Sequence, residues 1–109
     1  MATPKDTIVI LTTCPNRATA ESIARLLVER RYAACVNLID AVQSVYRWKD
    51  EIESDEETLL IIKTTKTRYA DIESTIQSNH PYDTPEVIAL DIVSGANSYL
   101  SWVAQSTEE

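Results

Sequence analysis

The order of strand-like and helix-like segments predicts an α+β protein, a ferredoxin-like split βαββαβ sandwich with a C-terminal helix. Apolar, β-branched segments alternate with amphipathic segments of helical spacing in that order. Two of the strand segments are long and follow one another, which predicts a long β-hairpin that projects beyond the sheet. With 109 residues and no linker or repeat, we expect a single domain over residues 1–109.

The first part of the chain predicts one strand and one helix. The segment Thr7 to Thr13 is apolar and β-branched, which indicates a buried strand that ends at Cys14-Pro15. Asn16 is a suitable N-cap, and apolar residues then recur at helical spacing. Basic residues suit a helix C-terminus, so the helix is expected to finish near Arg31.

The segment Ala34 to Trp48 predicts a strand of unusual length. Strands average about 5–6 residues, so we expect a bulge or bend near Asp40-Ala41. Its apolar residues occupy both odd and even positions and therefore both faces of the strand, which indicates that a helix or another subunit covers the second face. We expect Lys49 to Glu56 to be a polar connection and Glu57 to Thr65 to be the second strand of the hairpin.

The last third of the chain predicts a helix, a strand and a final helix. Apolar residues at helical spacing from Tyr69 onwards indicate a helix that ends near Asn79. Val87 to Val93 reads as a further strand, and Gly95 breaks it ahead of a short amphipathic helix.

Composition excludes several classes of protein. A net charge of −7 argues against nucleic acid and anionic membrane surfaces, because lysine and arginine clusters recognise both. The single glycine excludes a Walker loop and a dinucleotide fingerprint, which need several. No apolar run approaches the roughly 20 residues of a membrane span, and the first six residues lack signal-peptide features. Two cysteines are too few for a zinc ribbon, so we expect a cytoplasmic protein with reduced thiols.

The most informative candidate site is the segment His80-Pro81-Tyr82-Asp83-Thr84-Pro85-Glu86. Each proline fixes its φ at about −65° and restricts the residue before it, so the loop is expected to be stiff. The loop offers an imidazole, a phenol and a carboxylate, from His80, Tyr82 and Glu86. A well-made connection into the next strand is the alternative interpretation.

Metal binding has two candidate locations. His80 with Cys14 or Cys35 offers an imidazole and a thiolate suited to copper or zinc, although two or three ligands from one chain make an incomplete site. Cys35 lies in a strand and reads as a small core residue, whereas Cys14, at the strand end beside Pro15, is expected to be accessible. The hairpin tip, Asp50 to Glu57, holds six carboxylates in eight residues, and hard divalent cations bind oxygen ligands of this kind. A solvated acidic turn that keeps the hairpin from aggregating is the favoured interpretation of the tip.

Lys63 and Trp48 complete the candidate ligand-binding residues. Lys63 interrupts an apolar strand, so its ammonium needs a partner such as Glu86, Asp91 or a carboxylate of another subunit. Trp48, near the end of the long strand, is typical of an interface anchor. Nothing places a nucleophile beside His80, so we assign no catalytic residue and expect a non-enzymatic protein.

Five motifs in order carry a family resemblance that runs from the first strand to Trp102. They are Ala33-Ala34-Cys35-Val36-Asn37, Ser44-x-Tyr46-x-Trp48, Glu57-x-Leu59-Leu60-x-Ile62-Lys63-Thr64, His80-Pro81-Tyr82-x-x-Pro85-Glu86 and Tyr99-Leu100-x-Trp102. Through them the chain resembles the CutA family of divalent-cation tolerance proteins. The resemblance implies a ferredoxin-like fold in a tight homotrimer, similar to that of the PII signalling proteins, with hairpins that pair between subunits. It also implies a cytoplasmic role in copper and other divalent-metal tolerance, with no agreed molecular activity. We expect no required cofactor.

Two departures from the family pattern concern the site and the hairpin turn. Asn79 and Thr12 stand where some members carry a histidine and a cysteine as proposed copper ligands, so that constellation is incomplete here. Asp50 stands where many members have glycine. Aspartate tolerates left-handed backbone better than most residues, so the turn is expected to form.

The sequence supports two functions. The first is a non-enzymatic trimer of metal tolerance that binds Cu(II), another divalent cation or a small ligand weakly at inter-subunit clefts. Lys63, His80, Tyr82 and Glu86 are the expected cleft residues. The second is a PII-like sensor or scaffold that binds a small anionic metabolite and signals to a partner protein. A hydrolase that uses His80 is a third, minor interpretation.

Overall fold

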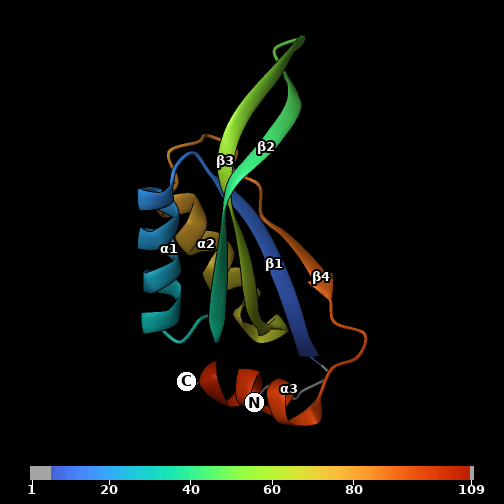
Figure 1. Cartoon of the computed structure of the whole chain (residues 1–109). Coiled ribbons are helices and arrows are strands. Elements are labelled where there is room, and N and C mark those ends of the chain that lie inside the picture. The colour runs from blue at the N-terminus through green and yellow to red at the C-terminus, as the bar shows by residue number, and fades with distance from the viewer. Residues whose placement is uncertain (1–5, 109) are drawn as a thin grey trace.

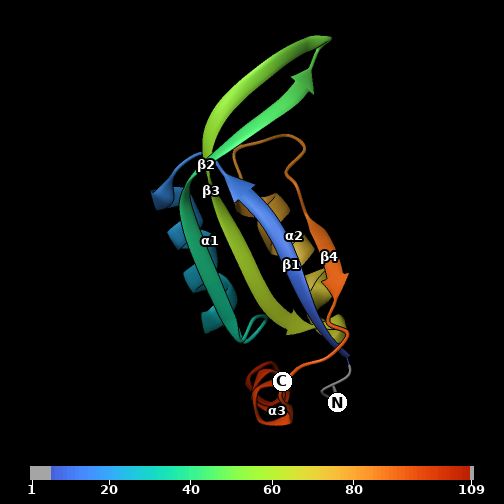
Figure 2. The same ribbon diagram turned by 45° about the vertical axis from the view of Figure 1, so that its right-hand side comes forward.

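The computed structural model describes residues 6–108 as a four-stranded antiparallel sheet with helices α1 and α2 on one face (Figures 1 and 2). Helix α3 lies at the end of the sheet opposite the hairpin (Figure 1). Residues 1–5 and 109 of the expected domain lie outside the described residues. The elements are β1 Thr7–Cys14, α1 Arg17–Glu29, β2 Cys35–Trp48, β3 Glu51–Thr65, the 3₁₀ turn Lys66–Arg68, α2 Tyr69–Asn79, β4 Ile88–Asp91 and α3 Asn97–Ser106.

The sheet order β2-β3-β1-β4 confirms the predicted ferredoxin-like topology. Strand β1 is central and pairs with β3 along its whole length, from Thr7 opposite Thr65 to Cys14 opposite Thr58. On its other side β1 pairs with the four residues of β4. Strands β2 and β4 are therefore the two edges of the sheet.

One apolar core lies between the sheet and the two helices. Alternate residues of the central strands point into it because side chains of a strand alternate between faces. Its most buried large members are Ile10 of β1, Leu60 and Ile62 of β3, Ile23 and Leu27 of α1, and Ile72 and Ile76 of α2. Each of these aliphatic side chains stabilises the fold by roughly 1.5–3 kcal/mol relative to full exposure.

Helix α1 begins and ends close to its expected residues. The side-chain oxygen of Asn16 accepts a hydrogen bond of 2.9 Å from the backbone N–H of Thr19, which confirms the predicted N-cap. The helix ends at Glu29, and Arg31 follows in the left-handed region with φ of 62°. The predicted end near Arg31 is thus two residues late.

The predicted bulge in the long strand is confirmed. The pairing of β2 with β3 shifts between Ile39 and Val42, where Ala41 has φ of 59°. Beyond the bulge the two strands project past the rest of the sheet (Figures 1 and 2). They are joined by Lys49 and Asp50, with φ of 50° and 65°, the positive-φ pattern of a type I′ turn.

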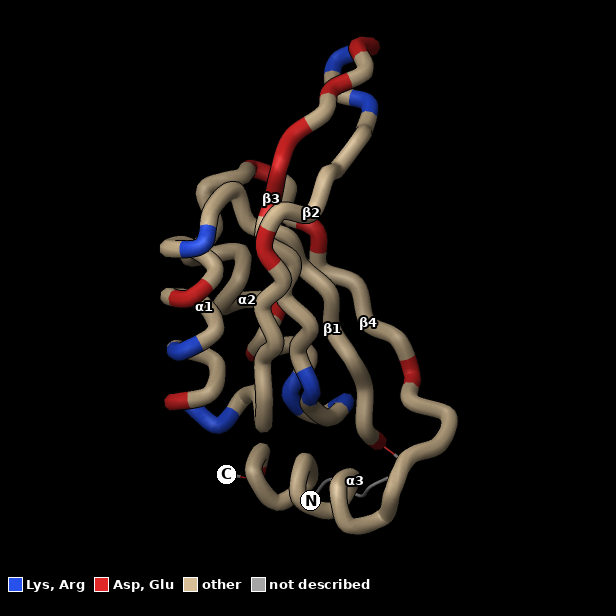
Figure 3. The backbone as a smooth tube through the Cα atoms, in the orientation of Figure 1, with Lys and Arg blue, Asp and Glu red and all other residues tan. Residues whose placement is uncertain are grey.

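Two predicted boundaries are wrong. Residues 49–56 are not a polar connection, because β3 already begins at Glu51, opposite Trp48. The acidic residues therefore lie in a strand (Figure 3), where backbone pairing rather than apolar alternation decides the structure. The last strand covers Ile88–Asp91 rather than Val87–Val93. Its ladder with β1 ends at the pair Ile8–Asp91, and beyond that pair the backbone N–H of Ile92 still donates a hydrogen bond of 3.2 Å to the carbonyl oxygen of Thr7.

Replacing Asp50 with glycine is expected to stabilise the hairpin. Asp50 has φ of 65°, where a Cβ atom is unfavourable and glycine is the preferred residue. Asp50→Gly should raise the free energy of unfolding by about 0.5 kcal/mol, measured by urea denaturation at one protein concentration. Gln43→Gly, in the regular part of β2, is the control and should lower it by roughly 0.5–1 kcal/mol. If both substitutions changed the free energy of unfolding in the same direction, the result would contradict the turn geometry.

Candidate functional site

A cleft of about 720 Å³ opens at the base of the hairpin. Strands β1, β2 and β3 form one part of its wall, and the loop between α2 and β4 forms the rest. Its lining residues are Thr13 of β1, Ser44, Val45, Tyr46 and Trp48 of β2, Glu57 of β3, and Tyr82, Thr84, Pro85 and Glu86 of the loop. The lining contains two carboxylates and three aromatic rings, and neither lysine nor arginine.

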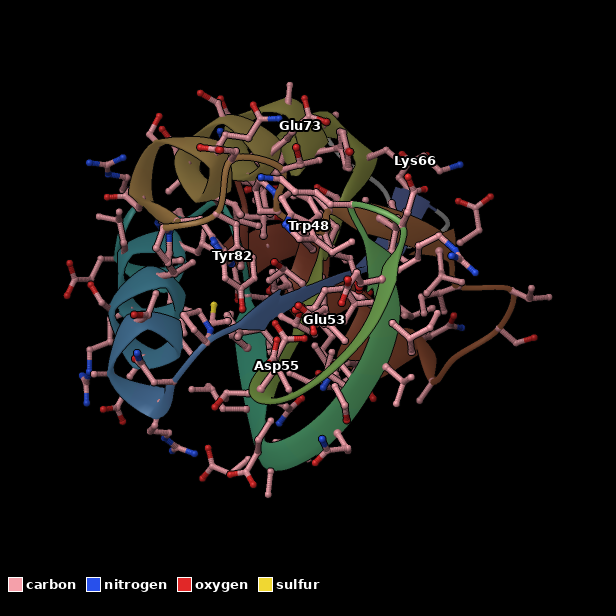
Figure 4. The ribbon with its side chains drawn as sticks, turned by 90° about the horizontal axis from the view of Figure 1, so that it is seen from above. Trp48, Glu53, Asp55, Lys66, Glu73 and Tyr82 are labelled. Carbon is pink, nitrogen blue, oxygen red and sulfur yellow. The ribbon has the colours of Figure 1, made fainter. Side chains whose placement is uncertain are left out.

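The bulge in β2 decides which side chains reach the cleft. Before it, Leu38 pairs with the core residue Leu60. The extra residue reverses the alternation, so Tyr46 beyond the bulge pairs with Glu53 and lies on the other face of the ribbon. Trp48 and Tyr82 line the same cleft, and seen from above Glu53 and Asp55 lie on the concave side of the hairpin (Figure 4).

His80 fixes the loop that forms the outer wall. Its buried imidazole lies with Nε2 2.7 Å from the carbonyl oxygen of Thr13, and Nδ1 accepts a hydrogen bond of 3.1 Å from the backbone N–H of Tyr82. An acceptor at Nδ1 requires the proton on Nε2, so Nε2–H donates to Thr13. The ring also contacts that of Tyr82, with centroids 4.6 Å apart.

Two tyrosines of the cleft donate hydrogen bonds to carboxylates. The Tyr82 hydroxyl donates to Glu57 at 2.9 Å, and the Tyr46 hydroxyl donates to Asp55. Burial, and then the bond to Glu57, raises the pKa of Tyr82 above its usual range. The bond to Asp55 raises the pKa of Tyr46 to about 12. Both phenols therefore remain neutral donors near neutral pH.

Three of the predicted ligand-binding residues meet in the cleft. Trp48, Tyr82 and Glu86 come from two distant parts of the chain and line the same cavity. His80 lies behind Tyr82, and both of its ring nitrogens contact backbone groups. The imidazole therefore positions the loop and presents no unoccupied nitrogen in this arrangement.

Cys14 does not lie at an accessible strand end, as the sequence had indicated, but is fully buried. Burial, and then the charge of Glu57, raises the pKa of its thiol to about 11. The thiolate is the form that binds metals, so this residue is poorly suited as a ligand at neutral pH. Within residues 6–108, no group of three or more histidine, cysteine, aspartate or glutamate side chains lies close enough together to hold a metal ion.

Lys63 lies elsewhere, and its expected partners are not those observed. It projects from β3 opposite Val9 and Cys35 and donates to the side-chain oxygen of Asn37. Asp91 instead pairs with Lys66 at 3.4 Å, and Glu86 lines the cleft. The sequence pattern placed Lys63 in a strand but carried no information on which end of the sheet the ligand site would occupy.

Tyr46 and Glu57 are cleft residues that the sequence reasoning did not select. Glu57 looked like one more member of a solvated acidic turn, yet it is only 8% exposed. The spacing of Ser44, Tyr46 and Trp48, two residues apart, was the available signal, because such residues share one face of a strand.

This fold and this cleft define a small ferredoxin-like α+β protein with a projecting hairpin and an aromatic, acidic cavity at its base. Within that class, the chain belongs to the CutA1 divalent ion tolerance protein family, whose sequence pattern matches residues 8–106.

Known relatives agree with this assignment. The chain is 49% identical over 96 residues to Protein CutA of Homo sapiens and 43% identical over 100 residues to the chloroplastic Protein CutA of Arabidopsis thaliana. These matches cover 88% and 92% of this chain but 54% and 55% of the relatives, so the chain spans about half their length. The solved structure of the divalent cation tolerance protein of Thermus thermophilus is similar with a TM-score of 0.92 and 40% identity, covering 94% of this chain and 99% of that one.

Within residues 6–108, no helix is both long enough and apolar enough to cross a bilayer.

The thiol of Cys14 is expected to resist alkylation in the folded protein. At pH 8, a pKa of about 11 leaves about one thiol in a thousand ionised, and the thiolate is the nucleophile. In a Cys35→Ser variant, iodoacetamide should leave native Cys14 unmodified and alkylate it fully in urea, as measured by mass spectrometry. The native rate should rise about tenfold per pH unit towards pH 11.

The same shift predicts a loss of stability in alkali. Because the pKa rises from 9.0 to about 11 on folding, the folded state binds this proton more tightly. The contribution of this proton to the free energy of unfolding is therefore complete below pH 9 and is lost as the pH rises through 11.

The alkylation experiment would contradict the burial of the Cys14 thiol if native Cys14 reacted rapidly at pH 8.

Proposed function

We propose that this protein acts in divalent-cation tolerance as a non-enzymatic cytoplasmic homotrimer that takes up a cation weakly in the cleft at the base of the hairpin. Membership of the CutA1 divalent ion tolerance family supports the general role. The observation that carries the cleft is its lining, which combines Glu57 and Glu86 with no lysine or arginine. A cavity of this charge attracts cations and repels anions.

The donor set favours weak binding over a tight soft-metal centre. Carboxylate and hydroxyl oxygens suit hard divalent cations, whereas copper prefers imidazole and thiolate. The imidazole of His80 contacts backbone groups through both nitrogens, and Cys14 is buried as a thiol. Two carboxylates leave several coordination positions to water or to groups of a neighbouring subunit.

The uncovered face of the sheet supports self-association. Helices α1 and α2 cover one face only (Figure 2). On the other face, Val9 and Leu11 of β1 pair with Leu90 and Ile88 of β4, and the latter two side chains are each half-exposed. An apolar sheet face requires a covering layer, and a second copy of the chain provides one.

The two free edges suit a closed ring. Strands β2 and β4 lie at opposite edges of the sheet, so the β2 edge of one copy can meet the β4 edge of the next. Head-to-tail contacts of this kind form a ring of cyclic symmetry when the rotation between neighbouring copies closes. The family resemblance supplies the number of subunits, three.

The assembly is tested by sedimentation equilibrium. We expect the parent protein to sediment with three times the mass of one chain. Leu90→Asp should shift it to the mass of one chain, because the charge is placed on the apolar sheet face. Val28→Asp, a change of an exposed apolar residue on the helical layer, is the control and should leave the trimer intact. A monomeric parent protein would refute the assembly.

Cation uptake is tested by calorimetric titration with Mn(II) and Cu(II). Changing both Glu57 and Glu86 to glutamine should weaken binding at least about fivefold, since each carboxylate supplies charge at the cleft. The control changes Glu21 and Glu29 of α1 to glutamine, which alters the net charge equally but at the far side of the sheet. Equal effects of the two double variants would assign the heat to the acidic surface as a whole.

Lys63 supports a second candidate function, that of an anion sensor. It lies on the open sheet face with Asn37 as its hydrogen-bond partner and forms no ion pair within the described residues. When another copy of the chain covers that face, the ammonium of Lys63 becomes buried and needs a negatively charged partner. Phosphate binding that survives in the cleft double variant and is lost in Lys63→Ala would favour this candidate.

A further inference from the structure

The imidazole of His80 belongs to the only histidine of the chain, and it is buried within a single subunit. The residue is 8% exposed, so neighbouring copies that cover the hairpin or the open sheet face can only bury it further. Its ring nitrogens contact the carbonyl oxygen of Thr13 at 2.7 Å and the backbone N–H of Tyr82 at 3.1 Å. These contacts therefore belong to the chain itself and do not depend on an exposed surface.

Both contacts require a neutral ring. In the neutral imidazole, Nε2–H donates to Thr13 and Nδ1 accepts from Tyr82. An imidazolium ion carries a proton on each nitrogen, so its Nδ1–H would face the N–H of Tyr82, and two donors repel one another. Histidine is also the side chain whose charge changes between pH 5 and 8. Protonation of the ring must therefore separate it from the backbone of Tyr82.

The surroundings of the ring supply partners for a positive charge. His80 is the C-cap residue of α2, and the C-terminus of a helix carries partial negative charge. Burial raises the pKa of the Cys14 thiol and of the Tyr82 phenol, so both remain neutral near neutral pH. A buried imidazolium therefore needs a carboxylate to balance its charge. The titratable side chains on the elements around the ring are Cys14 of β1, Glu57 of β3, Tyr82, Asp83 and Glu86 of the loop, and Asp71 and Glu73 in the first half of α2.

Tyr82 connects the ring to the cleft. Its backbone N–H contacts the imidazole, the centroids of the two rings are 4.6 Å apart, and its hydroxyl donates to Glu57 at 2.9 Å. Moving the backbone of Tyr82 therefore also moves the hydroxyl away from Glu57. Because Glu57 is only 8% exposed, the loss of that donor is costly, and the new N–H of the imidazolium is the group that replaces it.

We propose that His80 acts as a pH-sensitive switch. A proton that Nδ1 takes from solvent separates the ring from the backbone of Tyr82 and gives Glu57 the imidazolium as its partner in place of the Tyr82 hydroxyl. The cleft wall then carries one uncompensated carboxylate, Glu86, instead of two, so its affinity for a cation falls as the pH falls. This inference rests on the proposed function for its output, the uptake of a cation, and adds the means of its regulation.

The switch is tested by a nuclear magnetic resonance titration of the ¹⁵N-labelled, assembled protein from pH 8 to pH 5. The chain has one histidine, so every imidazole nitrogen signal comes from His80. We expect the Nε2–H tautomer at pH 8. As the ring gains its second proton, the amide signal of Tyr82 should shift with the same midpoint and lose its protection against hydrogen exchange. A ring that stays neutral down to pH 5, or that is protonated while the Tyr82 amide is unchanged, would overturn the proposal.

Two variants assign the transition to the proposed groups. His80→Asn keeps an acceptor close to the position of Nδ1 and cannot be protonated, so the Tyr82 amide should stay protected from pH 8 to pH 5. Glu57→Gln removes the partner of the imidazolium, so the midpoint should move to lower pH. A transition that persists in His80→Asn, or a midpoint that Glu57→Gln leaves unchanged, would contradict the mechanism. Circular dichroism checks that each variant folds, and the titration of the parent protein stands without them.

The effect on cation uptake is measured by calorimetric titration with Mn(II) at pH 7.5 and pH 5.5. Protonation of carboxylates weakens binding at pH 5.5 in the parent protein and in His80→Asn alike. We expect the loss of affinity to be at least about fivefold greater in the parent protein, because only its ring gains a charge. Equal losses would refute the control of the cleft by His80. If the parent protein binds no Mn(II) at either pH, the proposed function fails, while the titration of the Tyr82 amide still decides whether the switch exists.

Discussion

The buried imidazole of His80 is the contact on which the site depends. It joins the end of β1 to the loop after α2 by a hydrogen bond of 2.7 Å to the carbonyl oxygen of Thr13, and it accepts from the N–H of Tyr82 two residues later. This places the Tyr82 hydroxyl within reach of Glu57, so the buried carboxylate of Glu57 accepts a hydrogen bond from it. Pro81 and Pro85, which lie on either side of Tyr82, limit how far the loop can move away. One side chain thus links the central strand, the loop and the acidic wall of the cleft.

Much of the fold could be predicted because local chemistry and tertiary structure agree. The N-cap at Asn16, the order of elements and the bulge at Ala41 follow from capping preference, apolar spacing and strand length. Residues 51–56 were misassigned because an exposed strand has no apolar alternation. Only pairing with β2 reveals it, and pairing is a property of the folded chain.

The site was predictable only in part, because it also depends on how the strands pair in the folded chain. Trp48, Tyr82 and Glu86 were selected as single residues, but their convergence depends on the bulge, which changes the face that Trp48 occupies. Glu57 was hidden in an acidic run, since burial of one carboxylate among six cannot be read from composition. Lys63 was assigned to the same cleft because it is a charged residue in an apolar strand, although it lies with Asn37 on the open sheet face.

The projecting half of the hairpin has a consequence for how the protein responds to dilution. Beyond Ala41 the ribbon has two strands and none of the residues of the main core, and an isolated two-stranded ribbon is marginally stable in water. In the proposed trimer, docking of neighbours and ordering of this ribbon become a single linked equilibrium. Because one wall of the cleft belongs to the ribbon, ligand affinity and subunit affinity are coupled reciprocally. Protein concentration itself then acts as an effector of the site.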